Sequence, residues 1–71
     1  MARKVTFSQS IRDARQKLGK SRQELADQIG VSYASIAFWE TDYCKPRAAH
    51  LTALCKALKL PVRATRELVT A

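Results

Sequence analysis

Cys44, His50 and Cys55 are the side chains of this sequence best suited to metal chemistry. Three ligands at irregular spacing match no closed zinc site, so we predict no metal and no cofactor. Cys55 falls within a regular helical pattern, as a small core residue would. The two cysteines could in principle form a bridge, but the N-terminus lacks the apolar centre of a secretory signal. We therefore expect a cytoplasmic chain with reduced thiols.

Acid–base and nucleophilic catalysis find no support in the sequence. It contains one histidine, no Gly-rich phosphate loop and no pair of carboxylates in separated environments. Its 71 residues make one small domain, too small for a substantial cleft. No apolar run is long enough to span a membrane. We predict that residues 1–71 form a single domain that is not an enzyme.

Binding of a polyanion is the chemistry that the charge does favour. The formal net charge is +7, which suggests a polyanionic partner such as nucleic acid. The alternative is a solvated surface with a random excess of bases. The excess is concentrated at the N-terminal end, where the acid Asp13 is outnumbered by Arg3, Lys4, Arg12, Arg15, Lys17, Lys20 and Arg22.

Short helices are the elements that must position these side chains. Thr6 with Gln9, and Ser21 with Glu24, have the spacing of capping boxes. Gly30 ends the second helical pattern, and apolar residues recur at helical spacing throughout. The sequence therefore predicts an all-α fold with helices at about 7–18, 22–29, 32–40, 48–58 and 62–69.

The segment 32–40 is the ambiguous one, because its aromatic residues and isoleucine favour strands. The helical spacing of Ile36 and Trp39 and the N-cap residue Ser32 favour a helix. With the preceding helix and a three-residue turn it forms a helix-turn-helix over residues 21–40. In that motif the second helix projects its N-terminal residues into a major groove. Plain packing of two helices in a bundle is the alternative.

The run over residues 11–60 resembles the phage repressor and Cro-like helix-turn-helix domain, the XRE-type or lambda repressor-like family. The resemblance is carried by "IRDARQKLGKSRQELADQIGVS", then "I..WE", then "KP", then "L..L.KAL.L", in this order and without a gap. It implies a compact five-helix domain that binds operator DNA, usually as a two-fold dimer.

The resemblance also implies roles for individual residues. The positions implied to contact bases are Arg22, Ser32, Tyr33, Ala34, Ala37 and Phe38. The positions implied to contact phosphates are Arg15, Lys20, Ser21, Gln23, Ser35, Lys45 and Arg47. Arg15 and Glu40 align with a pair that forms a buried salt bridge in some members, and we predict that pair here.

The second helix of the motif departs from the family by lacking the amide and guanidinium groups that make bidentate base contacts. Three interpretations stay open. One is relaxed or T-rich specificity, with Ala34 and Phe38 against thymine methyl groups and a large phosphate contribution. Another is specificity from DNA shape, or from Arg3 and Lys4 in a minor groove. The third is an aromatic patch that contacts protein.

Two further positions depart from the family pattern. Arg47 stands where a serine or threonine cap is expected for the fourth helix. Asp42 stands where glycine is frequent, and it adopts the left-handed conformation less readily than glycine does. Trp39 is expected in the core, and Tyr43 on the surface of the loop.

We expect a sequence-specific DNA-binding transcriptional regulator, a repressor of phage, plasmid or bacterial origin that excludes polymerase from its operator. Its partner is double-stranded DNA, contacted by a dimer at two half-sites about one helical turn apart. The alternative is a protein-interaction module, such as an antitoxin or anti-regulator, that uses the patch of residues 33–38. The candidate dimer surface is Leu60, Val62, Leu68 and Val69.

Overall fold

A computed structural model describes residues 6–70, and α-helices make up most of this range. The predicted five-helix, all-α fold is confirmed, since the described residues contain no strand. In chain order the helices are α1 (Phe7–Lys17), α2 (Arg22–Ile29), α3 (Tyr33–Glu40), α4 (Ala48–Leu58) and α5 (Val62–Thr70).

Capping residues set most of the helix boundaries. Thr6 and Ser21 each form a complete capping box with the residue three positions later, so free N–H groups at the helix starts are satisfied. The Ser32 hydroxyl accepts the backbone N–H of Ser35 at 3.2 Å and caps α3. Gly30 ends α2 with a left-handed φ of 77°, a conformation that glycine adopts without steric cost.

Three predicted helix ends are off by one residue, each at a half-helical position. The first helix ends at Lys17 rather than at residue 18, because Leu18 is its C-cap. The third begins at Tyr33 rather than at residue 32, because Ser32 is its N-cap. The last runs to Thr70 rather than to residue 69. Boundaries of this kind differ by a residue or two between criteria.

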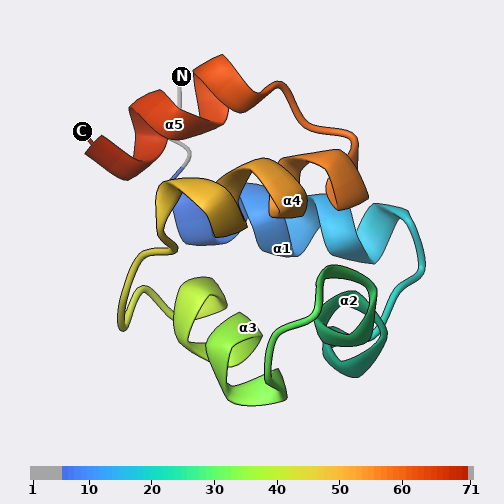
Figure 1. Cartoon of the computed structure of the whole chain (residues 1–71). Helices are drawn as coiled ribbons and strands as arrows, with labels where there is room; N and C mark the ends of the chain where they lie inside the picture. The colour runs from blue at the N-terminus through green and yellow to red at the C-terminus, as the bar shows by residue number, and fades with distance from the viewer. Residues whose placement is uncertain (1–5, 71) are drawn as a thin grey trace.

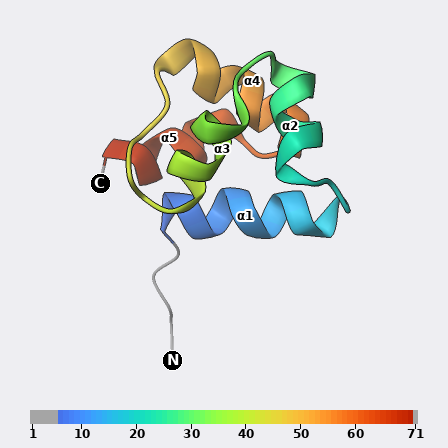
Figure 2. The same cartoon turned by 90° about the horizontal axis from the view of Figure 1, so that it is seen from below.

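The helices enclose one apolar core, and α3 lies at one end of the molecule. In Figure 1, α2 and α3 form the lower end, α1 and α4 cross the middle, and α5 covers the opposite end. Seen from below, α3 lies between α1 and α4 in the view (Figure 2). The packed pairs include α2 with α3 and α1 with α3. The buried apolar side chains are Phe7, Ile11, Leu25, Ala26, Ile36, Trp39, Leu51, Leu54, Cys55, Ala57 and Leu58.

Trp39 and Cys55 are buried, as the sequence predicts, at 4% and 0% exposure. Both cysteines of the described chain are free thiols, Cys44 on the surface and Cys55 in the core. Within residues 6–70 no helix has the length and apolar character needed to cross a bilayer.

Candidate nucleic-acid interface

The eight-residue helix α3 divides its side chains between the core and solvent. Ile36 and Trp39 point inward and are almost wholly buried. On the outer side, Tyr33 is 48% exposed and Phe38 is 42% exposed. Ala34 is also exposed between them. The residues predicted to contact bases are therefore presented on one short helix anchored by its inner side.

A buried carboxylate ties α3 to both preceding helices. The side chain of Glu40, at the end of α3, has no exposed surface. It accepts hydrogen bonds from Arg15 of α1, from Nε at 2.7 Å and from Nη2 at 3.1 Å. It also accepts one from Nε of Arg22 of α2 at 3.1 Å. A carboxylate without solvent requires such partners, so the three groups fix α1, α2 and α3 relative to one another.

The predicted Arg15–Glu40 ion pair is thus present, and a second arginine joins it. The sequence gave no sign that Arg22 would share the carboxylate. The guanidinium of Arg22 also bonds to the Tyr33 side chain; this bond, and secondly that to Glu40, raises the pKa of Arg22 above its ordinary value. The Arg22 side chain keeps 30% of its surface exposed. It therefore remains charged and accessible beside Tyr33.

The N-terminus of α2 is capped by side chains from its own first turn. The Ser21 hydroxyl accepts the N–H of Glu24 at 3.0 Å, and the Glu24 carboxylate accepts the N–H of Ser21 at 2.9 Å. These bonds from Ser21, backbone first and hydroxyl second, lower the pKa of Glu24. Gln23 donates to Asp27 at 2.8 Å on the exposed side of the helix.

The loop after α3 folds back onto the helix end. The Thr41 hydroxyl donates to the Ala37 carbonyl at 2.8 Å, and the Tyr43 N–H donates to the Phe38 carbonyl at 3.0 Å. Asp42 makes the reversal with a left-handed φ of 64°, where the family pattern favours glycine. The rings of Phe38 and Tyr43 lie 4.8 Å apart at an interplanar angle of 36°.

Two cationic side chains follow in the same loop. Lys45 pairs with the Asp42 carboxylate, and its Nζ lies 5.7 Å from the centre of the Phe7 ring. Arg47 is exposed and occupies the N-cap of α4, where its side chain makes no capping hydrogen bond. The first turn of α4 therefore keeps N–H groups for which no side-chain cap is provided.

Other predicted site residues are engaged within the chain. The Arg15 guanidinium bonds to Glu40 and to the Lys20 carbonyl, and only 12% of its side chain is exposed. The Lys20 ammonium bonds to the Gln28 side chain and, at 3.3 Å, to the Ala57 carbonyl. Arg3 and Lys4, predicted for a minor groove, lie outside the described residues.

The predicted dimer residues are half-buried. Their side chains pack against the core of their own chain and leave only part of their apolar surface outside. This surface belongs to α5 and the segment before it, at the end of the molecule opposite α3 (Figure 1). The residues concerned are Leu60, Val62, Leu68 and Val69.

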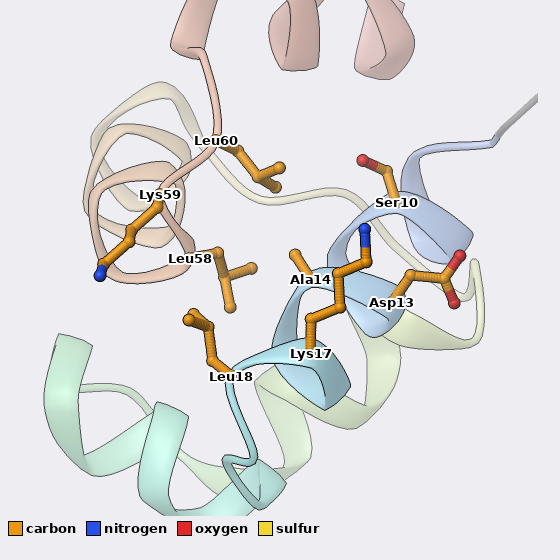
Figure 3. Close-up of a pocket in the computed structure, with 8 residues that line it drawn as sticks. All are labelled: Ser10, Asp13, Ala14, Lys17, Leu18, Leu58, Lys59 and Leu60. Atoms are coloured by element: carbon orange, nitrogen blue, oxygen red, sulfur yellow. The ribbon is translucent and has the colours of Figure 1, made fainter.

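A groove of about 410 Å³ lies between α1 and the end of α4. Its lining comes from α1, α4 and the residues that follow each of them, with none from α2 or α3. Ala14, Leu18, Leu58 and Leu60 give it an apolar floor, as Figure 3 shows. Among the described residues, no group of three His, Cys, Asp or Glu side chains is placed to hold a metal ion.

Comparison with known proteins agrees with this architecture. The model of the helix-turn-helix family matches residues 11–64. No curated protein matches the sequence significantly. Among solved structures, the chain is similar to the P22 c2 repressor protein in complex with synthetic operator 9T in the presence of Tl+. The similarity covers 87% of this chain and 94% of that chain, with 31% sequence identity and a TM-score of 0.83.

The extent of these matches settles the class of protein. The family match spans more than half of the chain and includes all of α2, the turn and α3. Its fold and family are those of DNA-binding regulators, which are not enzymes. The chain belongs to the helix-turn-helix family and carries a DNA-binding domain of the phage-repressor type.

Proposed function

We propose that this protein is a sequence-specific transcriptional repressor that binds operator DNA as a dimer. The observation that carries the proposal is the exposed outer side of α3, held rigidly by the buried Glu40 and its two arginines. A helix of this size fits the major groove of B-DNA. The similarity to a repressor in complex with operator DNA supports the same orientation.

Base contacts come from α3 and from Arg22 beside it. Arg22 supplies guanidinium donors suited to guanine, whereas the exposed residues of α3 offer hydroxyl groups and apolar surface. A charged, partly exposed Arg22 next to Tyr33 supports this placement. The proposed base-contacting residues are Arg22, Ser32, Tyr33, Ala34, Ala37 and Phe38.

Phosphate contacts flank α3 on both sides. The uncapped first turn of α4 and the exposed Arg47 together offer N–H donors and a positive charge, a combination that suits a phosphate. We give Arg15 and Lys20 an internal role, because their charged groups bond within the chain. The proposed phosphate-contacting residues are Ser21, Gln23, Ser35, Lys45 and Arg47.

Occupancy of the operator is sufficient for repression in this account. The protein excludes polymerase from a promoter by covering it, and no effector ligand is required. A dimer places its two copies of α3 about one helical turn apart on the duplex. The expected operator is therefore a palindrome with half-sites at that spacing.

Selection from a random duplex pool tests the proposal. The protein is mixed with the pool at about 150 mM salt, and the retained DNA is sequenced. An enriched palindrome with half-sites about one turn apart is the expected result. Retention that disappears with added salt and enriches no sequence would reduce the interaction to phosphate affinity and refute the repressor assignment.

Arg47→Ala provides a check on the phosphate contacts. Loss of one neutralised phosphate is expected to lower the slope of log affinity against log salt by about 0.9 for each site. The matched control is Arg63→Ala on α5, an exposed arginine at the opposite end of the molecule, which should leave the slope unchanged. Equal slopes for Arg47→Ala and the parent would remove Arg47 from the interface.

A protein-interaction role for the patch of residues 33–38 is the second candidate. The exposure of Tyr33 and Phe38 favours it, because large apolar side chains on a surface often mark a contact site. The two functions separate cleanly. Phe38→Ala weakens selection of the palindrome if the patch serves DNA, and leaves it intact if the patch serves a protein partner.

A further inference from the structure

Phe38 and Tyr43 form a paired aromatic surface at the end of α3. Their ring centres are 4.8 Å apart, within the range of a favourable aromatic contact. The hydrogen bond from the Tyr43 N–H to the Phe38 carbonyl holds the two backbones together. Both rings are nevertheless open to solvent, with Phe38 at 42% and Tyr43 at 77% exposure. We refer to these two residues as the aromatic pair.

The surroundings of the aromatic pair suit duplex DNA better than an apolar partner. It continues the outer side of α3, and the loop that supplies Tyr43 also supplies Lys45 and Arg47. The whole chain carries a formal net charge of +7. A duplex approaching α3 would therefore meet the pair flanked by cations placed for its phosphates.

A major groove offers few apolar contacts. The edges of the bases present hydrogen-bond donors and acceptors, and the C5-methyl group of thymine is the apolar exception. The Phe38 ring can neither donate nor accept a conventional hydrogen bond. Pressed against a polar edge, it would leave that edge without water and without a partner, at a cost in free energy. A methyl group carries no such cost.

We propose that the aromatic pair binds the 5-methyl group of a pyrimidine in the major groove. The inference rests on the proposed function and specifies what α3 reads in its target. The contact recognises the methyl group rather than the base that bears it. Thymine and 5-methylcytosine therefore satisfy it, whereas uracil and unmodified cytosine do not. On this account the protein responds to cytosine methylation at the contacted position.

Competition among chemically altered DNA pools tests the inference. Random-sequence duplexes of equal length are prepared with thymine and cytosine, with uracil and cytosine, or with uracil and 5-methylcytosine. The protein selects from the mixed pools at about 150 mM salt. Replacement of thymine by uracil is expected to lower retention, and 5-methylcytosine is expected to restore part of it. On an enriched duplex, each contacted methyl group removed should weaken binding about fourfold.

Substitutions assign the effect to the aromatic pair. Phe38→Ala should bind thymine and uracil duplexes equally, while Tyr43→Phe should keep the preference because the ring and not the hydroxyl makes the contact. Leu18→Ala is the matched control: Leu18 is a large apolar side chain with 36% exposure in the groove between α1 and α4. It should keep the preference as well. Helical circular dichroism of each variant establishes that it is folded.

The possible outcomes distinguish this inference from the proposed function. Equal retention of the thymine and uracil pools overturns methyl recognition and leaves DNA binding in place. A preference that survives Phe38→Ala overturns the role of the aromatic pair. Absence of retention from every pool, at low salt as well, refutes the proposed function itself.

Discussion

Glu40 is the residue on which the arrangement of α1, α2 and α3 depends. Its carboxylate is fully enclosed and its three hydrogen bonds come from Arg15 and Arg22. Burial of a charge is costly unless its partners are well placed, and removal of one partner is costlier than removal of the whole group. The ion pairs therefore specify how the three helices meet more than they add to stability.

Arg15→Met tests this directly. The substitution leaves Glu40 with one bond from Arg22, so the free energy of unfolding should fall by about 3 kcal/mol, the lower end of the range for a broken buried pair. The double variant Arg15→Met with Glu40→Leu should recover most of the loss, since no buried charge remains. Urea denaturation followed by circular dichroism measures both. A parental midpoint for Arg15→Met would show that the pair is not structurally required.

Lys59 offers a gain in stability. It is the C-cap of α4 and adopts a left-handed φ of 58°, a conformation that side chains with a Cβ disfavour. Lys59→Gly should stabilise the fold by about 1 kcal/mol, or roughly 5 °C in Tm for a domain of this size. Lys59→Ala is the control, because it removes the charge and keeps the strained backbone. A similar rise for both variants would trace the effect to charge instead.

The capping boxes are the features that made the helices predictable. Each joins a hydroxyl residue to Gln or Glu three positions later, and both form as the sequence predicts. They depend on neighbours in the chain, so local sequence determines them. The same locality explains why the predicted helix ends differ from the observed ones by no more than one residue.

Glu24 makes the α2 capping box sensitive to acid. Its pKa is lowered from an ordinary value of 4.5, so its contribution to stability is complete above that pH and is lost as the pH falls through the lowered value. Glu24→Gln retains the cap geometry without the titration. Parent and variant should differ by a constant amount near neutral pH, and the parent should lose stability relative to the variant well below pH 4.5. A constant difference at all pH values would contradict the assignment.

Contacts between distant residues were harder to predict. The Arg15–Glu40 pair was predicted from family resemblance, but the bond from Arg22 to the same carboxylate depends on how α2 crosses α3. The pairing of Phe38 with Tyr43 depends on the left-handed turn at Asp42, which brings the loop back over the helix end. Spacing along the chain contains neither angle. The exposed position of Phe38 was foreseeable, because its neighbour Trp39 takes the buried side.

At the scale of the whole molecule, the free protein should be a monomer that dimerises on DNA. The apolar side chains of α5, Leu68 and Val69, already pack on the core of their own chain. Little apolar surface remains there, and stable dimers require a substantial buried interface. Sedimentation of the free protein should give one 8.0 kDa species, and the complex with a palindromic duplex should contain two copies. A dimer in the absence of DNA would contradict this.

The central claim is that the outer side of α3 and the loop after it contact duplex DNA. Titration of isotope-labelled protein with a selected duplex, followed by the amide resonances, tests it most directly. The account predicts shifts confined to the start of α2, to α3, to residues 41–47 and to the first turn of α4. Shifts concentrated on α5 and the groove between α1 and α4, with α3 unaffected, would contradict it.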